Sequence, residues 1–594
     1  MPSFFFSFTL HGADLEKEAS KYIDEEKGVL TSAEALQGAS DIIAEQISDS
    51  AEARKFLKEL IEKHGFISSV TKTEEDSVYS MYYEYSEPVS KIPSHRILAV
   101  NRGENEGILK VSLEIDETEA LRILDHLFIK EGSSSTDFCR EAAKDSYTRL
   151  ILPSLEREIR NALTEKANEQ AIKMFGSNLK PLLMQPPVKD KTVLAVDPAY
   201  RTGCKLAVVN GSSKVLYTGV IYPTPPQSKI QESEAKVLEI IRKYGVDCIS
   251  IGNGTASKES EIFVANTIKK ATRPVSYMVV NEAGASVYSA SKLGAEEFPD
   301  FDVSVRSAVS IARRLQDPLS ELVKIEPRSI GVGQYQHDVP PAQLNESLQG
   351  VVEDCVNSVG VDLNTASVSL LKYIAGVTSA TAKNIVGYRE ENGSFKSRSE
   401  LKKVKGLGPK AFTQCAGFLR IPGGKNVFDS TGVHPESYDA AKALLALFGF
   451  TENDVKNGGI AGLSKKAEEY GLTKAAEECS VGVPTLTDII KELEKPGRDI
   501  RDELPAPMLR SDIMDMNDLK EGTVLTGTVR NVIDFGVFVD IGVHQDGLVH
   551  ISQICNRYIK HPSEVLKLGE IVKVKVLSVD SAKKRISLTM KDVE

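Results

Sequence analysis

The chain has 594 residues, of which 41% are hydrophobic and 26% are charged, as in globular proteins rather than disordered tails. No apolar run approaches the roughly 18 residues that a membrane-spanning helix needs. The seven cysteines are scattered without a close pair, which excludes a disulfide framework and a zinc knuckle. At roughly 150 residues per domain the length indicates about four domains. We therefore expect a multi-domain protein of the reducing cytoplasm.

Charge is distributed unevenly along the chain, although its sum is −11. Residues 1–95 carry 9 Lys and Arg against 18 Asp and Glu, so this end should repel phosphate. Residues 372–425 carry 11 basic side chains against only three glutamates, a local charge of +8. This contrast makes the second segment the better candidate for contact with a polyanion.

The first third of the chain is predicted to be mostly helical. Helical spacing of apolar residues covers 16–64, and a long helical stripe covers 137–183, interrupted near Pro153. Apolar runs at 97–100 and 108–115 predict strands. Between the helices lies a tyrosine-rich patch, which consists of Tyr79, Tyr82, Tyr83 and Tyr85. Such a patch can stack nucleic-acid bases, but packing inside the protein is the favoured interpretation.

The pattern changes after Pro186-Pro187, which we take as a domain boundary. Strands are predicted at 192–196, 205–209, 215–221, 248–251 and 276–280. Helices are predicted at 232–244 and 305–324. An opening strand meander followed by alternating helices and strands indicates a mixed α/β sheet.

Three acidic residues of this α/β region are candidate catalytic residues. Asp197 ends the first strand, where ligands of such sheets gather, and Glu282 and Asp317 are its candidate partners. Ribonuclease H-type nucleases use such carboxylates to hold two divalent metals. The strand at 248–251, however, ends in Gly252-Asn253-Gly254, and a neutral amide is a weaker Mg²⁺ ligand. The alternative, that Asp197 and Asp317 cap turns or helices, remains open.

Two consecutive helix-hairpin-helix patterns occupy Leu370 to Ile421. In the second, Gly406 and Gly408 bring bare backbone N–H groups toward a phosphate, and Lys405 and Lys410 add charge. The first copy keeps one glycine and has Thr378 at the second position, so it should bind phosphate less well. Contacts to backbone phosphate predict little base selectivity.

The last 80 or so residues predict a small closed barrel of the OB type. Its strands are expected at 523–529, 536–541, 548–551, 571–579 and 586–590. Phe535 and Phe538 suggest base stacking beside a basic groove, to which Lys583, Lys584 and Arg585 contribute. Their spacing of three places the two rings on opposite faces of a regular strand, so core packing remains an alternative.

Long strings of the sequence resemble Tex-type transcription accessory proteins. These strings are 92–104, 193–209 with Asp197-Pro198, Gly252-Asn253-Gly254-Thr255, Arg313-Arg314-Leu315-Gln316-Asp317-Pro318 and 331–339. The resemblance implies a multi-domain α+β fold. Its domains would be a helical scaffold with a small strand-containing segment (1–190), a YqgF or ribonuclease H-like domain (191–325), a tandem helix-hairpin-helix domain (326–425), a helical linker domain (426–510) and an S1 domain (511–594).

The resemblance also implies functional residues and departures from the family. The nucleic-acid face of an S1 domain corresponds here to Phe535, Phe538, His550, Asp580 and Arg585. Family members are regarded as nucleic-acid binders rather than established nucleases, so we expect no enzyme activity and no cofactor, with Mg²⁺ or Mn²⁺ required only if the ribonuclease H-like site is active. The chain departs from the family at Ala199, where glycine is usual, and is expected to begin inside the family's N-terminal helix-turn-helix region.

The favoured function is therefore a monomeric transcription accessory protein that binds RNA or single-stranded DNA with low sequence specificity. The transcription machinery or the ribosome is the expected protein partner, and no membrane is involved. One rival is a divalent-metal-dependent nuclease that uses Asp197, Glu282 and Asp317. A second rival is a docking scaffold whose acidic helical half binds polymerase or ribosome.

Overall fold

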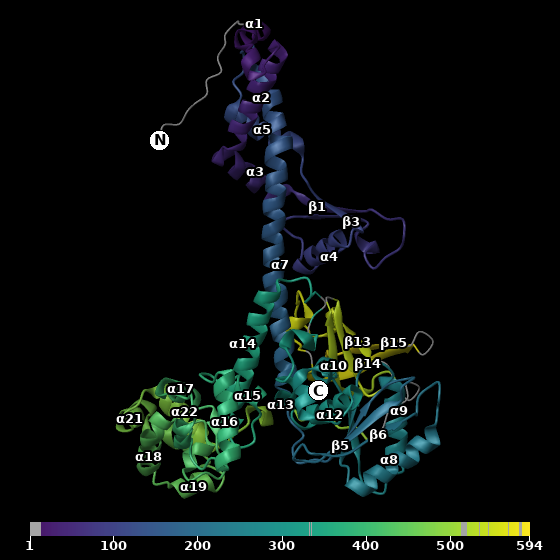
Figure 1. The fold of residues 1–594 in the computed structure, drawn as a ribbon, viewed down its shortest axis with the longest axis vertical. Helices are drawn as coiled ribbons and strands as arrows, with labels where there is room; N and C mark the ends of the chain where they lie inside the picture. Colours follow the sequence, from purple (N-terminus) through teal and green to yellow (C-terminus); the bar gives the residue numbers. More distant parts are fainter. Residues whose placement is uncertain are drawn as a thin grey trace. The chain divides into compact units, whose positions relative to one another are not determined.

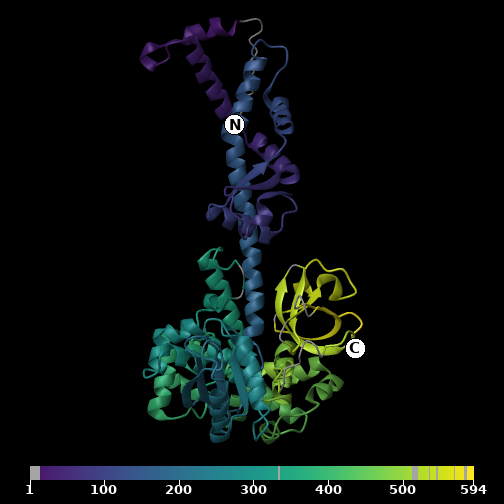
Figure 2. The ribbon, with the colours of Figure 1, turned by 90° about the vertical axis from the view of Figure 1, so that its right-hand side faces the viewer.

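A computed structural model describes residues 14–331, 333, 335–511, 519–533, 535–543, 546–567, 569–580 and 585–593, so Lys583, Lys584 and the first 13 residues lie outside the described part. Backbone packing divides the chain into two units, Met1–Met174 with Tyr335–Pro341 and Phe175–Gln334 with Ala342–Glu594. Figures 1 and 2 show the ribbon from two sides. Among the described residues, no helix combines the length and the hydropathy that crossing a bilayer requires.

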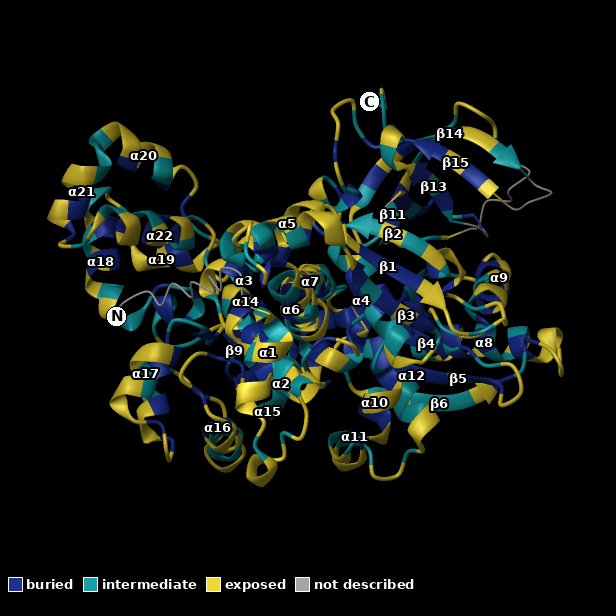
Figure 3. Ribbon diagram, turned by 90° about the horizontal axis from the view of Figure 1, so that it is seen from above, coloured by how far each residue is buried: buried dark blue, intermediate teal, exposed yellow. Residues whose placement is uncertain are grey.

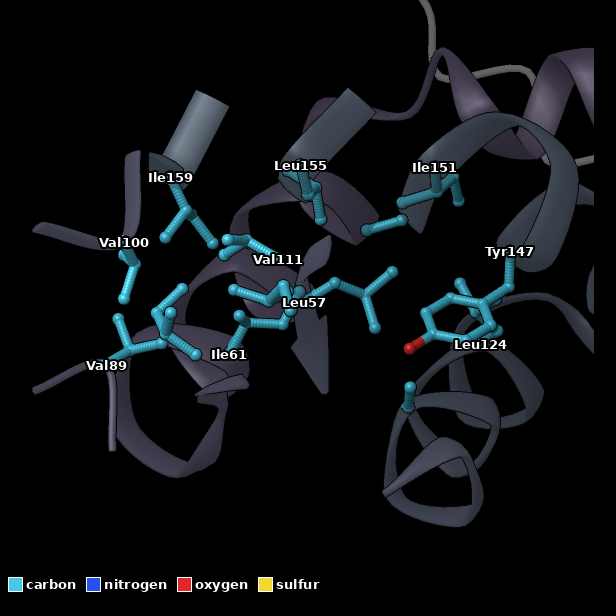
Figure 4. Packing of buried hydrophobic residues seen from close by; sticks show 14 of the residues in the cluster. Leu57, Ile61, Val89, Val100, Val111, Leu124, Tyr147, Ile151, Leu155 and Ile159 are labelled. Atoms are coloured by element: carbon cyan, nitrogen blue, oxygen red, sulfur yellow. The ribbon is translucent and has the colours of Figure 1, made fainter. Parts of the chain in front are cut away.

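The first unit packs helices against a three-stranded sheet. Its helices are α1 (Leu15–Ala19), α2 (Ser32–Ser48), α3 (Ala51–His64), α4 (Ser94–Asn105), α5 (Glu117–Phe128), α6 (Thr136–Asp145) and the first part of α7 (Leu152–Leu183). The strands β1 (Phe66–Thr71), β2 (Glu84–Pro88) and β3 (Leu109–Glu114) lie in the antiparallel order β2-β1-β3. Figure 4 shows Leu57 and Ile61 of α3, Leu124 of α5 and Leu155 of α7 in one apolar core.

One strand predicted for this unit is wrong. The run Ile97-Leu98-Ala99-Val100 lies in α4, and each of its side chains is at most 4% exposed. A short run that is buried on all sides does not distinguish a strand from a helix. The strand at 108–115 is confirmed as β3. The interruption near Pro153 is a π-helical segment, Ser146–Ile151, which runs directly into α7 with Pro153 as its second residue.

The tyrosine-rich patch is used for packing. Tyr79 and Tyr82 are only 6% and 7% exposed, and Tyr83 and Tyr85 pack against the same core. Burial raises the pKa of Tyr79 to about 12, with Glu106 acting in the same direction. These rings are therefore unsuited to stacking bases.

The second unit contains a five-stranded mixed sheet of the order β6-β5-β4-β7-β8. Its strands are β4 (Val193–Asp197), β5 (Cys204–Val209), β6 (Val215–Ile221), β7 (Cys248–Gly252) and β8 (Ser276–Val280). β4 runs antiparallel to β5 and parallel to β7, so the predicted meander and alternation are confirmed. Helices α8 (Ile230–Tyr244) and α9 (Ser257–Ile268) cover one face and α12 (Val303–Gln316) covers the other. The central strands β4, β5 and β7 are buried, whereas the edge strand β6 is partly exposed, as Figure 3 shows.

The helix predicted at 305–324 is divided in two. α12 ends at Gln316, and the short α13 (Pro318–Leu322) begins at once with Asp317 as its N-cap and Pro318 in its first turn. Proline is tolerated in a first turn but disfavours helical backbone in the residue before it, which explains the break. Two further short helices, α10 (Ala285–Ala290) and α11 (Lys292–Glu297), connect β8 to α12.

Two helical domains follow the long α14 (Pro341–Val359). The first consists of α15 (Val368–Leu371), α16 (Ser379–Asn392), the 3₁₀ helix Arg398–Lys403 and α17 (Pro409–Cys415), closed by the parallel strands β9 (Val361–Asp362) and β10 (Leu419–Arg420). The second consists of α18 (Tyr438–Leu447), α19 (Glu452–Lys456), α20 (Leu463–Tyr470), α21 (Leu472–Glu478) and α22 (Val483–Glu494). This second domain has a core of its own, so it is a packed domain rather than a connecting segment.

The C-terminal strands form a closed barrel of the order β11-β12-β13-β15-β14, drawn in yellow in Figure 2. They are β11 (Val524–Ile533), β12 (Gly536–Asp540), β13 (Gly547–His550), β14 (Ile571–Asp580) and β15 (Arg585–Thr589). β13 and β15 are parallel and the other neighbours are antiparallel. The predicted five-stranded OB-type barrel is therefore confirmed.

Arg510 connects this barrel to the α/β sheet. Its backbone exchanges two hydrogen bonds with Tyr277 of β8, of 2.7 and 2.9 Å. Its guanidinium lies 2.8 Å from the carboxylate of Asp540 in β12 and 3.5 Å from that of Glu261 in α9. Although burial opposes it, Arg530 and Arg510 lower the pKa of Asp540. The carboxylate of Asp540 thus stays ionised and holds the end of β12 against Arg510.

Candidate nucleic-acid interface

The outer face of β12, β13 and β15 brings together most of the predicted barrel contacts. Phe538 of β12 pairs with Leu548 of β13, which pairs with Ser587 of β15. Paired residues point to the same side of a sheet, and side chains alternate along a strand. His550 and Arg585, each two residues from a member of this row, therefore lie on the same outer side. The intervening residues fill the barrel core.

Phe535 belongs to the turn before β12, so the rule of alternation does not apply to it. Its ring is 54% exposed, and its carbonyl accepts a 2.8 Å hydrogen bond from the N–H of Ile551, next to His550. Gly536, the next residue, pairs with His550. Among the described residues, the barrel core contains neither phenylalanine, so core packing does not account for these two rings.

Polar groups complete this surface. His550 is fixed by its own turn, since its Nδ1 accepts the backbone N–H of Ser552 at 3.3 Å. Asp580 and Arg585 face each other across the hairpin of β14 and β15. A guanidinium can bind phosphate, and a carboxylate can accept hydrogen bonds from a base or a sugar hydroxyl. Together with two rings for stacking, these groups are typical of a single-strand-binding barrel.

Sequence reasoning missed one exposed aromatic residue of the barrel. Tyr558, in the connection between β13 and β14, is 89% exposed. It lies between Arg557 and Lys560, which are also exposed. An aromatic ring between two basic residues is itself a signal for single-strand contact, and it could have been noticed in the sequence.

The second hairpin turn has the conformation that its glycines predict. Gly406 has φ of 82°, in the left-handed region, and Gly408 is extended with φ of −75° and ψ of 172°. Between them Leu407 is buried, whereas Lys405, Gly406, Gly408 and Lys410 are exposed. A Cβ added to Gly408 would meet no atom within 4 Å. The glycine therefore leaves space in front of the backbone, and no contact with the described part of the chain requires it.

The first hairpin differs from the second at the position of Gly408. Thr378 occupies the equivalent place and caps α16 itself, because its hydroxyl accepts the N–H of Thr381 at 3.2 Å. No side chain of the described residues caps α17. The two hairpins pack against each other, with Asn384 of the first donating a 2.8 Å hydrogen bond to the carbonyl of Lys405. This arrangement gives a physical reason for the prediction that the second turn is the better phosphate site.

The arginines and lysines of residues 372–425 have different uses. Arg398 is 1% exposed and donates to the carbonyls of Leu419 and Val433, both at 2.7 Å. Arg389 donates to the carbonyls of Leu363 and Ala366, and Arg420 to that of Arg498. The eight lysines are exposed, and no ion pair involves them among the described residues. The positive surface predicted from local charge is therefore a lysine surface, and the arginines stabilise the fold.

A third turn of the same kind precedes α22. Ser480 has φ of 57°, and Gly482 has φ of −73° and ψ of 154°, close to the values of Gly406 and Gly408. Its exposed neighbours are Glu477 and Glu478 rather than lysines. The backbone of the motif recurs there without the charge that would attract phosphate.

Two of the three candidate catalytic acids lie together. Burial raises the pKa of Asp197, and burial and the charge of Asp197 raise the pKa of Glu282. The carboxylate of Glu282 lies against Gly252 and Gly254, where an added Cβ would collide with it. Asn253 does not face this pair as a ligand, because its side-chain oxygen accepts the N–H of Glu282 at 3.0 Å.

Asp317 does not join them, which corrects the expectation that it points to the same edge. It caps α13 through Ser320 and forms a 2.7 Å ion pair with Arg501. Asp197 is hydrogen-bonded to Ser307, near the start of α12, whereas Asp317 follows the end of that helix. Ten helical residues separate these positions by about 15 Å. The three acids therefore do not form one set of ligands, and the described residues contain no cluster of three potential metal ligands.

Comparisons with known proteins agree with this architecture. Family models match residues 11–175 (Tex central region-like), 191–316 (Tex protein YqgF-like domain), 356–420 (Helix-hairpin-helix motif), 426–501 (HHH domain) and 518–591 (S1 RNA binding domain). The segment predicted as a helical linker is thus similar to a further helix-hairpin-helix domain. Its third turn, described above, is the feature that the sequence alone did not disclose.

Three relatives cover nearly the whole chain. "Uncharacterized protein YdcI" of Bacillus subtilis is 53% identical over 97% of this chain and 80% of its own length. "Protein YhgF" of Escherichia coli is 46% identical over 97% of this chain and 75% of its own length. "Transcriptional accessory protein Tex" of Neisseria gonorrhoeae is 44% identical over 97% of this chain and 76% of its own length.

The fold and its exposed surfaces define a multi-domain nucleic-acid-binding protein with an S1 barrel and helix-hairpin-helix domains. The relatives and the matched domains make the assignment specific. The chain belongs to the Tex family.

Proposed function

We propose that this protein is a transcription accessory factor that holds RNA or single-stranded DNA with little sequence preference. The observation that carries the proposal is the shared outer face of the barrel, on which Phe538, His550 and Arg585 lie beside the exposed ring of Phe535. The printed name of the Neisseria gonorrhoeae relative supports the transcription role.

Binding is divided between two surfaces of different chemistry. The barrel supplies aromatic rings, and every base has a π-face, so stacking tolerates any sequence. The second hairpin turn supplies exposed backbone and the lysines Lys405 and Lys410, which contact phosphate without reading bases. A strand held in this way is retained by its polyanionic backbone and by unpaired bases.

The setting of this activity is also a proposal. The protein acts as a monomer in the cytoplasm, in contact with the transcription machinery or the ribosome. It uses no resident cofactor, since Asp317 does not complete a set of metal ligands with Asp197 and Glu282. A nuclease mechanism is not favoured, since Asp317 is bound to Arg501.

Fluorescence anisotropy with a labelled single-stranded RNA tests the proposal on the full chain. Phe535→Ala should weaken binding by about 1–3 kcal/mol, or about 5- to 160-fold, because one base loses its stacking partner. Val524→Ala is the matched control, since Val524 is 49% exposed on the same barrel but pairs with Lys575 of β14. Equal affinities of Phe535→Ala and the parent chain would exclude the barrel face as the binding surface.

A further inference from the structure

A groove between α3 and α5 of the first unit has the features of a docking site. It has a volume of about 490 Å³ and is lined by residues of both helices. Its floor is formed by Phe56 and Leu60 of α3 and by Ile123 and Leu127 of α5. Phe56 is 42% exposed, whereas the other three side chains are half-buried and rest on the core of the unit.

The spacing of the floor residues matches a helical ligand. Phe56 and Leu60 are four residues apart, as are Ile123 and Leu127, so each pair forms a short ridge along its helix. An amphipathic helix laid between two such ridges would insert its own apolar residues at positions i, i+3, i+4 and i+7. The floor is aliphatic apart from one ring, which favours leucine-type side chains over nucleic-acid bases.

The polar residues that line the groove are mainly basic, although the surrounding sequence has an excess of acidic residues. Residues 1–95 carry twice as many acidic as basic side chains, 18 against 9. The groove is nevertheless lined by Lys63 and Arg122, with His64 and His126 beside them, against the single acid Glu59. Neither Lys63 nor Arg122 has an ion pair among the described residues.

Several other cations of this unit form ion pairs. Lys58 binds Glu158, Arg96 binds Glu87, and Arg160 binds Glu104. Lys63 and Arg122 therefore line the same groove without a carboxylate partner among the described residues. An acidic ligand would supply the carboxylates that they lack, at the edge of an apolar surface.

We propose that the groove between α3 and α5 binds an acidic amphipathic helix of a partner protein. The leucine-type stripe of that helix contacts the floor, and its flanking Glu or Asp residues contact Lys63 and Arg122. This function is independent of the barrel and of the lysine turn, so it joins a protein partner to a chain that holds nucleic acid elsewhere.

Anisotropy titrations of the full chain with synthetic helical peptides test this proposal. The probe carries leucines along one face and glutamates on the flanks. One comparison peptide has lysine in place of every glutamate, and another has the same composition with the leucine stripe shuffled. The acidic striped peptide should bind at least about tenfold more tightly than either, since it alone satisfies both floor and rim.

Two groove variants and two matched controls localise the binding. Phe56→Ser and the charge reversal Lys63→Glu/Arg122→Glu should each weaken the acidic peptide by at least about fivefold. Ile42→Ser and Lys55→Glu change an exposed apolar residue of α2 and an exposed lysine of α3 outside the groove, and should leave affinity unchanged. Circular dichroism of each variant establishes that the helices are intact.

Several results would overturn the proposal. The first is no saturable binding of the acidic peptide up to about 100 µM, an affinity near the weak end of specific recognition. The second is equal binding of the lysine peptide. A third is displacement of the peptide by single-stranded RNA, which would make the groove a nucleic-acid site. A fourth is a dimer in sedimentation that Phe56→Ser dissociates, which would make a second copy of the chain the occupant.

Discussion

Replacing Lys405 and Lys410 with glutamine should weaken single-strand binding by an amount that depends on salt in a calculable way. Both lysines are exposed beside the turn of Gly406 and Gly408, and neither has an ion pair among the described residues. A lysine that neutralises one phosphate of a single strand contributes about 0.7 to the slope of log affinity against log salt concentration. Loss of both contacts should therefore reduce the slope by about 1.4.

The slope difference of about 1.4 determines how much the affinities of the parent chain and the variant diverge as salt increases. Between about 50 and 200 mM salt, a fourfold increase, the parent chain should lose about sevenfold more affinity than Lys405→Gln/Lys410→Gln. Aromatic stacking on the barrel is insensitive to salt, so the variant should retain binding at high salt. Glutamine keeps much of the length of lysine, which limits the change to charge.

The assay is anisotropy of a labelled single-stranded RNA over a salt series with the full chain. Lys55→Gln/Lys72→Gln is the matched control, because both lysines are exposed and lie in the acidic first unit. The control should keep the parental slope. A slope that is unchanged in Lys405→Gln/Lys410→Gln, or changed equally in the control, would refute the role of this turn.

Three further predictions concern other parts of the chain. Gly408→Ala should weaken RNA binding without lowering the stability of the fold. The added methyl group would meet no described protein atom within 4 Å, but it would occupy the space through which a phosphate reaches the backbone N–H groups. Unaltered binding at low salt would show that phosphate does not approach the backbone at Gly408. Arg398→Met should destabilise the helix-hairpin-helix region by about 3–5 kcal/mol, since buried carbonyls lose their charged donor. Urea denaturation monitored by hydrogen exchange measures this loss. Lys396→Met, which changes an exposed neighbour, should leave the stability unchanged. Burial and Asp197 raise the pKa of Glu282 in the fold, so native stability is greater below that pKa and falls as pH rises through it. Glu282→Gln should therefore raise the unfolding temperature more at pH about 8 than at pH about 4, and a gain at low pH alone would contradict this sign.

Strand periodicity predicted the α/β sheet and the barrel well, because alternation and turn residues are local signals. The five strands of each sheet occur where apolar runs end in glycine or polar turns. The strand predicted at 97–100 was wrong, because a segment that is buried on every side shows neither the period of a strand nor that of a helix. Burial of this kind is decided by tertiary packing around α4, which the local sequence does not contain.

For the candidate sites, too, the sequence predicted local backbone features but not how distant residues pack together. The turn of Gly406 and Gly408 was predictable because left-handed backbone requires glycine locally. The separation of Asp317 from Asp197 was not, because it depends on the direction in which α12 crosses the sheet. Likewise, a charge count treats Arg398 and Lys405 alike, although one lies inside the fold and the other on its surface. Only the packed structure distinguishes a cation that stabilises the fold from one that is exposed and can contact a ligand.

The central claim is that single strands contact the barrel face and the lysine turn of the C-terminal half. Ultraviolet cross-linking of a uridine-rich RNA to the full chain, followed by mass spectrometry of the linked peptides, tests it most directly. The predicted cross-links fall on peptides that contain Phe535 and Phe538, His550 or Lys405 to Lys410. Cross-links confined to the acidic first unit, or none at low salt, would contradict the account.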